Sequence, residues 1–72
     1  LRAIVTTRIA FVAKEMKSGG TKISMRSKFA DVAEICGIFG GGGHKYAAGC
    51  TIKAPVEDAA RKILEEIKKH EI

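Results

Sequence analysis

The stretch IAFVAKEMKSGGTKISMRS, residues 9–27, predicts two strands joined by a tight turn. Its first part, residues 9–16, is apolar over the length of a typical strand. A short polar segment follows, with residues suited to a hairpin turn: Ser18, Gly19 and Gly20. The upstream residues TTRIAF, 6–11, are expected to extend the first strand, and residues 1–8 otherwise form a lead-in.

The second half of this stretch, residues 21–27, alternates in polarity as a half-buried strand does. Ile23 and Met25 face one side, and the residues between them are polar or cationic: Lys22, Ser24 and Arg26. This pattern predicts a strand with one side in a core and a basic side facing outward.

Residues 29–40, FADVAEICGIFG, change to a helical period. Asp31 suits the N-cap, with Glu34 three residues later, and Gly40 suits the left-handed residue that ends a helix. Within this segment, Gly37 weakens the last turn by about 1 kcal/mol relative to alanine. The predicted apolar stripe consists of Phe29, Val32, Ile35, Cys36 and Phe39.

The remaining segments complete a small two-layer domain. HKYAAG, residues 44–49, predicts a short helical turn, and CTIKA, residues 50–54, predicts a third strand. Pro55 opens a last helix with an acidic first turn, a basic last turn and three expected i, i+4 ion pairs: Glu57–Arg61, Asp58–Lys62 and Glu65–Lys69. Its apolar face is expected to contain Val56, Ala59, Ala60, Ile63, Leu64 and Ile67.

The predicted fold is therefore α/β of the α+β kind, a three- to four-stranded mixed sheet covered by helices in the order ββααβα. Its 72 residues make one domain, 1–72, too small to hold a core and a buried catalytic cleft of its own. Because the chain begins at Leu1 and not at a methionine, it is expected to be a fragment of a longer protein.

The net charge of +5 is unevenly distributed. Residues 1–53 contain nine Lys and Arg residues against three acids, and residues 54–72 contain four against five. This excess favours an anionic partner such as a nucleotide or nucleic acid, the alternative being a basic surface that serves solubility. No apolar run is long enough to span a membrane.

Cys36 and Cys50 are the two cysteines of the chain. Without a secreted-type cysteine framework they indicate a reduced, cytoplasmic context rather than a disulfide. A metal site that also uses His44 is the alternative, but neither CxxC nor HxxxH spacing is present. Two buried small apolar side chains are the favoured interpretation.

The glycine run at residues 40–43 continues directly into His44 and Lys45. Four glycines are entropically unfavourable, so they indicate a place where side chains would obstruct something. One hypothesis is a flexible or strained loop. The other is a concave nest of backbone N–H groups for an anion, assisted by the N-terminus of a following helix. The run matches neither the P-loop nor the dinucleotide-binding pattern.

Polar side chains near this run are candidate phosphate ligands. His44 would donate to a phosphate oxygen, and Arg26 would hold a phosphate or carboxylate with Ser24 and Ser27 as further donors. Each has a structural alternative, as a loop-capping histidine and a solvated strand arginine. Tyr46 is suited either to stacking on a base or to packing.

Residues 23–52, ISMRSKFADVAEICGIFGGGGHKYAAGCTI, resemble the C-terminal DHHA1-type domain of DHH-family phosphoesterases. The resemblance is carried by an S-x-R-S strand, a DVAEI helix and the block GGGGHxxAAG. It points to the branch that cleaves short oligoribonucleotides, cyclic-dinucleotide products and phosphoadenosine phosphate. Lys45 and Tyr46 fill the pair of positions after the histidine that is variable in this family, so the resemblance implies no particular base preference.

This resemblance implies a substrate-binding domain that is inactive alone. A separate N-terminal DHH domain in cis would hold two manganese-type ions and perform hydrolysis, and this chain would bind no metal. The implied substrate-binding residues are Ser24, Arg26, Ser27, Gly40, Gly41, Gly42, Gly43, His44 and Lys45. Of these, His44 would lie nearest the scissile phosphate.

Substrates implied by the resemblance are oligoribonucleotide, single-stranded DNA, phosphoadenosine phosphate, cyclic dinucleotide or polyphosphate, with no membrane partner. A second hypothesis is a non-catalytic RNA-binding module, because alanyl-tRNA synthetases end in similar glycine-block domains. A purely structural module is the third.

Overall fold

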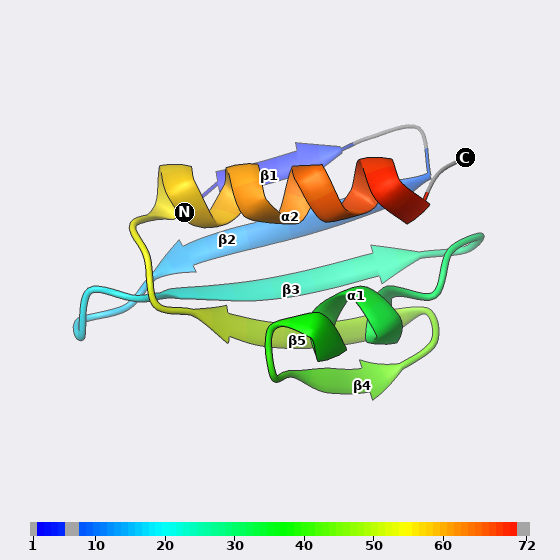
Figure 1. Cartoon of the computed structure of the whole chain (residues 1–72), viewed down its shortest axis with the longest axis horizontal. Helices are drawn as coiled ribbons and strands as arrows, with labels where there is room; N and C mark the ends of the chain where they lie inside the picture. Colours follow the sequence, from blue (N-terminus) through cyan, green and yellow to red (C-terminus); the bar gives the residue numbers. More distant parts are fainter. Residues whose placement is uncertain (1, 6–7, 71–72) are drawn as a thin grey trace.

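The computed structural model describes residues 2–5 and 8–70 of the chain. Within these ranges the elements follow one another as shown in Figure 1, with these bounds: β1 Arg2–Val5, β2 Ile9–Glu15, β3 Thr21–Ser27, α1 Val32–Ile38, β4 Gly42–His44, β5 Ala47–Ile52 and α2 Val56–His70. The predicted hairpin is confirmed, since β2 and β3 flank the turn at residues 16–20 and pair in antiparallel register.

All five strands of the described chain form one sheet in the order β1-β2-β3-β5-β4, and every neighbouring pair is antiparallel. The combination of α and β structure is confirmed, whereas the prediction of a three- to four-stranded mixed sheet was wrong. Residues 2–5 form a strand of their own rather than a lead-in, and half of the glycine run becomes an edge strand. The expected extension of the first strand over residues 6–11 includes Thr6 and Thr7, which lie outside the described residues; β2 itself begins at Ile9.

The helical turn expected at residues 44–49 was also wrong. Lys45 and Tyr46 form a hairpin turn between β4 and β5, and β5 begins at Ala47. The carbonyl groups of this turn accept hydrogen bonds from distant residues: Val32 N–H donates to Lys45 O at 2.9 Å and Ser27 N–H donates to Tyr46 O at 3.1 Å. Residues distant in sequence therefore satisfy the carbonyl groups of this turn, so no local helical hydrogen bonds are needed to satisfy them.

The first helix is close to its prediction. The side chain of Asp31 accepts a hydrogen bond from Glu34 N–H at 3.1 Å, so Asp31 is the N-cap. Beyond the last turn Gly40 has a φ of +81°, the conformation expected after a helix end. Phe29 is the exception, because it precedes the helix and is 73% exposed instead of lying on the buried stripe.

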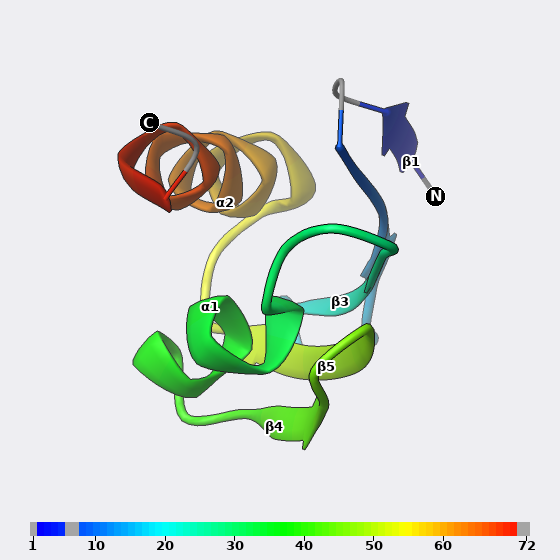
Figure 2. The same ribbon diagram turned by 90° about the vertical axis from the view of Figure 1, so that its right-hand side faces the viewer.

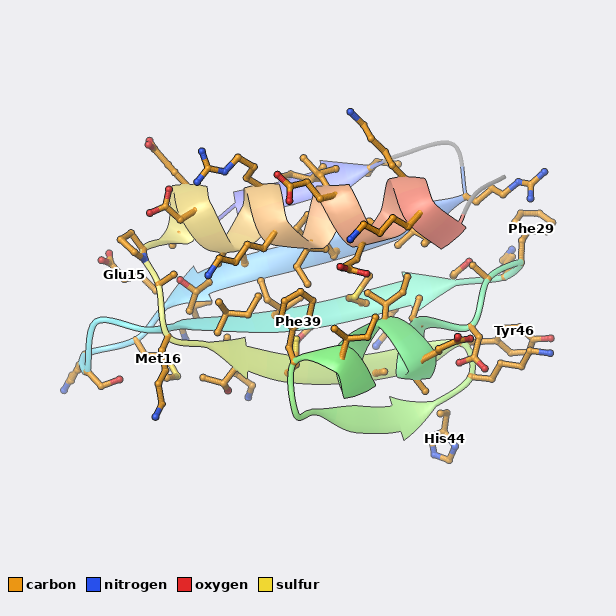
Figure 3. The ribbon with its side chains drawn as sticks, viewed as in Figure 1. Glu15, Met16, Phe29, Phe39, His44 and Tyr46 are labelled. Carbon is orange, nitrogen blue, oxygen red and sulfur yellow. The ribbon has the colours of Figure 1, made fainter. Side chains whose placement is uncertain are left out.

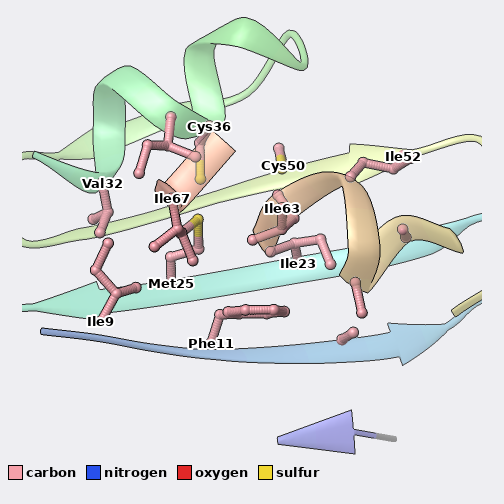
Figure 4. Packing of buried hydrophobic residues seen from close by; sticks show 14 residues of the cluster. Ile9, Phe11, Ile23, Met25, Val32, Cys36, Cys50, Ile52, Ile63 and Ile67 are labelled. Carbon is pink, nitrogen blue, oxygen red and sulfur yellow. The ribbon is translucent and has the colours of Figure 1, made fainter. Parts of the chain in front are cut away.

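Both helices cover the same face of the sheet and leave the other face open (Figure 2). The core lies between the helices and the sheet and is built by alternate strand residues and one side of each helix (Figure 4): Ile9, Phe11, Ala13, Ile23, Met25, Val32, Ile35, Cys36, Cys50, Ile52, Ala59, Ala60, Ile63 and Ile67. The predicted apolar face of α2 is confirmed, with Val56 and Leu64 at its half-buried margin. The domain thus has a core of its own.

The polar contacts of this layer include a buried hydrogen bond to the segment before α2 and ion pairs within α2. The buried Thr21 hydroxyl donates to Ala54 O at 2.8 Å, which ties the start of β3 to the segment before α2. On α2 the ion pairs that form have i, i+3 spacing, Asp58–Arg61 and Glu66–Lys69, both at 3.3 Å, rather than the predicted i, i+4 spacing. Neither helix of the described chain is long and apolar enough to cross a membrane.

Candidate functional site

Strand register places several predicted site residues on the open face. Residues directly opposite each other in an antiparallel pair point to the same face. Ser24 pairs with Gly49, and Gly49 pairs with Gly42. One step along, Arg26 pairs with Ala47, and Ala47 pairs with His44. The core-facing positions of β3 are Thr21, Ile23, Met25 and Ser27, so both of these rows lie on the face that no helix covers.

Arg26, Ala47 and His44 form what we call the phosphate row. Neighbouring strands lie about 4.8 Å apart, so the Cα atoms of Arg26 and His44 are separated by roughly 10 Å across β5. Ala47 between them has a side chain of a single methyl group, and the adjacent row has glycines in both β4 and β5. Together these residues form a flat, shallow surface with a guanidinium at one side and an imidazole at the other.

This open face is positively charged. Its outward-facing strand positions, within the described residues, contain Lys14, Lys22 and Arg26 and no Asp or Glu. Such a surface attracts anions, and a planar guanidinium matches the geometry of a phosphate. The sequence-level prediction of a basic, outward-facing strand is thus confirmed in its geometry.

The glycine run divides into residues that the fold requires and one that it does not. Gly40 and Gly41 complete the end of α1, because their N–H groups donate to Gly37 O and Cys36 O at 3.1 and 2.9 Å. A Cβ on Gly41 would collide with Gly49 O and Cys50. Gly43 has a φ of +145°, and a Cβ there would lie 2.7 Å from the Ala48 Cα atom. Gly41 and Gly43 thus let this segment approach β5 closely, whereas Gly40 is suited to its positive φ at the end of α1.

Gly42 differs from its neighbours. A Cβ built on it would meet no atom within 4 Å, and its φ lies outside the left-handed region. The fold therefore places no steric restriction on Gly42, which lies on the open face opposite Gly49 and two residues before His44. A bare position that the fold does not require is consistent with a ligand that lies close to the backbone.

The predicted nest of successive N–H donors does not form. The N–H group of Gly41 is already bonded within the chain, and β4 is an extended edge strand whose N–H groups point alternately to opposite sides. The run leads directly into β4 and then β5 rather than into a helix, so no helix begins beside it to contribute its N-terminus. The backbone of the block supplies at most alternate donors, and His44 and Arg26 become the main candidate ligands.

The position of Ser27 differs from the expectation that it assists Arg26. Ser27 faces the helix layer, is 8% exposed, and has its hydroxyl fully engaged: it donates to Arg8 O at 2.7 Å and accepts from the N–H groups of Phe29 and Ala30 at 3.0 and 2.9 Å. It therefore organises the loop after β3 and does not reach the open face. Lys45 lies in the β4–β5 turn with its ammonium 5.6 Å from the Tyr46 ring centroid.

The two cysteines face each other between the helix layer and the sheet, Cys36 on α1 and Cys50 on β5, and both are free and buried (Figure 4). A hydrogen bond to Cys50 and burial together raise the pKa of Cys36 far above its usual range. Accepting that bond lowers the pKa of Cys50. In the part of the chain described by the structure, no three His, Cys, Asp or Glu side chains cluster in a way that could hold a metal ion.

Two site residues, Ala47 and Gly49, could have been found from sequence with a better strand boundary. Ala47 and Gly49 alternate with the inward-facing Cys50 and Ile52, so extending the third strand backwards would have placed them on the open face. Phe29, whose exposure is described above, was assigned to the helix stripe because its spacing matches the helical period by coincidence.

The fold and the glycine block define this chain as a member of a known family. The family model for the DHHA1 domain matches residues 1–70, so the chain belongs to the DHHA1 domain family. This is the type of domain found at the C-terminus of DHH-family phosphoesterases.

Among curated proteins, the chain is similar to "Oligoribonuclease NrnB" of Bacillus subtilis (strain 168). The two are 44% identical over 39 residues, which cover 51% of this chain and 10% of that protein. The chain thus spans a small part of the length of the relative it matches.

Proposed function

We propose that this domain binds the phosphate groups of short oligonucleotides or nucleotide phosphates on the open face of its sheet, for hydrolysis by a partner domain. The observation that supports it best is the phosphate row, which sets Arg26 and His44 on either side of a small residue. The outward-facing strand positions that the structure describes on this face include no acidic side chain. Similarity to an oligoribonuclease supports the same substrate class.

In this proposal the residues have separate tasks. Arg26 holds one phosphate through its guanidinium fork, with Ser24 as a neighbouring donor, and His44 donates to the next phosphate. Gly42 leaves room for the ligand to approach β4. Ser27, Gly40, Gly41 and Gly43 act indirectly, since they hold the strands and loops that carry these ligands.

Hydrolysis is assigned to a DHH domain in cis, and the domain described here is the substrate-binding unit of residues 1–72. The described residues do not fit a metal centre, because no cluster of ligating side chains is present among them. The two manganese-type ions implied by the family resemblance would be held by that catalytic domain. A cytoplasmic location is proposed because both cysteines are free thiols, as is usual in a reducing compartment.

The test is a titration of the 72-residue chain with a 5′-phosphorylated dinucleotide and with pyrophosphate, followed by NMR. Hydrogen bonds to charged groups contribute about 1.5–3 kcal/mol, so Arg26→Ala and His44→Ala are each expected to weaken dinucleotide binding by about tenfold or more. Gly42→Ala is expected to weaken binding with no loss of stability. Wild-type affinity in both the Arg26 and His44 variants would refute the proposal.

Arg61→Ala is the matched control for Arg26→Ala. It removes the same charge from an exposed arginine on α2, where Arg61 pairs with Asp58. The sheet lies between this helix layer and the open face (Figure 2), so the control is expected to leave binding unchanged. A comparable weakening in both arginine variants would indicate a nonspecific effect of net charge.

The RNA-binding alternative has one observation in its favour. Lys14 and Lys22 pair across β2 and β3, four residues along β3 from Arg26, so the basic surface extends beyond what a dinucleotide would occupy. Titration with a structured tRNA distinguishes the two hypotheses. Tight tRNA binding that Lys22→Ala weakens, with no binding of the dinucleotide, would support the RNA-binding module.

A further inference from the structure

A second concave site lies at the end of the sheet where β2 begins and β3 ends. It has a volume of about 390 Å³. Its lining includes aromatic, aliphatic and cationic side chains from three separate parts of the chain: Val5, Arg8, Arg26, Lys28, Phe29 and Tyr46. Figure 3 shows Phe29 and Tyr46 at the same end of the molecule as His44, with Glu15 and Met16 at the opposite end.

The apolar side chains of this pocket are unusually exposed for a domain with a complete core. Phe29 is 73% exposed, Tyr46 52% and Val5 79%. Single exposed apolar residues need no explanation, but three that line one concavity indicate a binding surface. Aromatic rings with accessible faces are suited to stacking against another planar group.

One buried residue fixes the backbone at both aromatic positions. The Ser27 hydroxyl accepts a hydrogen bond from Phe29 N–H at 3.0 Å, and Ser27 N–H donates to Tyr46 O at 3.1 Å. The same hydroxyl donates to Arg8 O at 2.7 Å, which links a third lining residue. The segments that carry the two rings are therefore held in place by the fold before any ligand binds, which lowers the entropic cost of binding.

The charge of the pocket selects among possible occupants. Arg8, Arg26 and Lys28 contribute three positive charges, and the described lining contains no Asp or Glu. A planar apolar group joined to an anion satisfies both features, whereas a purely apolar protein surface would leave the cations without partners. A nucleobase joined to a phosphate has this chemistry.

We propose that this pocket takes the base and sugar of one nucleotide, stacked against Phe29 and Tyr46, with its phosphate at Arg26. The inference rests on the proposed function, because Arg26 belongs both to the pocket and to the phosphate row. The volume lies within the range typical of small-ligand sites. One end of the substrate is then held by its base, and the chain continues along the phosphate row toward His44.

The test compares adenosine 5′-monophosphate with ribose 5-phosphate, which has the same sugar and phosphate but no base. Tyr46 is the only tyrosine of the chain, and tryptophan is absent, so the intrinsic fluorescence of the protein reports on this pocket. The monophosphate is expected to change Tyr46 fluorescence and to shift the amide signals of residues 27–29, and ribose 5-phosphate is expected to bind about tenfold more weakly.

Phe29→Ala is expected to remove this difference between the two ligands by weakening binding of the monophosphate about tenfold. Ile38→Ala is the matched control, because Ile38 is also an exposed apolar residue, 52% exposed, but lies on α1 outside the pocket lining. It is expected to leave both affinities unchanged. Thermal unfolding of both variants checks that the fold is retained.

Failure of this inference is distinguishable from failure of the proposed function. Equal binding of the two ligands, unaffected by Phe29→Ala but weakened by His44→Ala, would overturn the base pocket and retain the phosphate row. A Phe29→Ala variant that loses affinity for ribose 5-phosphate to the same extent would also overturn stacking. A change in Tyr46 fluorescence on adding unphosphorylated adenosine, abolished in Phe29→Ala, would support the pocket even if His44→Ala had no effect.

Discussion

Replacing Gly42 and Gly43 separately by alanine tests whether adjacent glycines serve different purposes. Gly43 has a φ of +145°, and a Cβ on it would lie 2.7 Å from Ala48 Cα and 2.8 Å from Ala47 O. These are backbone atoms of the paired strand, so no side-chain rotation relieves the contact. Backbone strain of this kind contributes about 1–3 kcal/mol, and displacement of β4 from β5 adds to it.

We therefore expect Gly43→Ala to lower the free energy of unfolding by about 2–4 kcal/mol. Gly42→Ala meets no atom within 4 Å and is expected to raise it by about 0.4–1 kcal/mol, since alanine reduces the entropy of the unfolded chain. A domain of this length has a net stability of roughly 4–11 kcal/mol, so the difference between the two variants is readily measured.

The assay is urea unfolding followed by far-UV circular dichroism, with linear extrapolation to water. Gly37→Ala is the control, because Gly37 lies inside α1 with open space around its Cα; it is expected to stabilise the chain by about 1 kcal/mol. If Gly43→Ala were as stable as Gly42→Ala, the close approach of β4 to β5 could not be the reason for glycine at position 43.

Three further predictions concern buried polar groups. Ser27→Ala removes three hydrogen bonds to the backbone and is expected to lower the free energy of unfolding by about 1–3 kcal/mol. It is also expected to broaden the NMR signals of the loop after β3. The control Ser24→Ala, on the open face, is expected to change the free energy of unfolding by less than about 0.5 kcal/mol. Thr21→Val leaves Ala54 O without its 2.8 Å donor and is expected to reduce stability by about 1–3 kcal/mol in urea unfolding; an unchanged midpoint would show that water replaces this bond. The pKa of Cys36 is raised in the folded state, so the folded protein keeps this thiol protonated while the unfolded chain ionises it near pH 9.0. The contribution of Cys36 to the free energy of unfolding is therefore complete below that pH and falls above it, by at most about 1.4 kcal/mol per pH unit. The hydrogen bond with Cys36 lowers the pKa of Cys50, and burial alone would raise it, so a Cys36→Val variant keeps a buried thiol at Cys50 that opposes ionisation. The double variant Cys36→Val/Cys50→Ala is therefore expected to show a smaller fall between pH 9 and 10.5; an identical fall in the wild type and the double variant would contradict this.

Local patterns predicted those elements whose partners are close in sequence or whose periodic pattern continues over many residues. The turn at Ser18 to Gly20, the alternation of β3 and the apolar face of α2 all follow from composition and spacing. The N-cap at Asp31 and the helix-ending Gly40 are likewise local, because capping depends on residues within one turn.

The errors occurred where tertiary partners replaced local ones. Four consecutive glycines carry no strand propensity, and β4 exists because β5 pairs with it. The residues after His44 have a composition suited to a helix, but their carbonyl groups accept hydrogen bonds from Ser27 and Val32 instead. Residues 2–5 were too few to show a pattern, and their pairing with β2 makes them a strand.

The candidate site shows the same division. Sequence by itself determined which residues have phosphate-binding chemistry, because a guanidinium, an imidazole and bare glycines are properties of residue type. The tertiary structure decided which of them share a surface: cross-strand register brings Arg26 and His44 to one face and turns Ser27 to the other. It also commits Gly41 and Gly43 to close contact with β5 and Gly40 to the end of α1. Register depends on pairing between strands distant in sequence, and a shift of one residue would move every side chain of a strand to the opposite face.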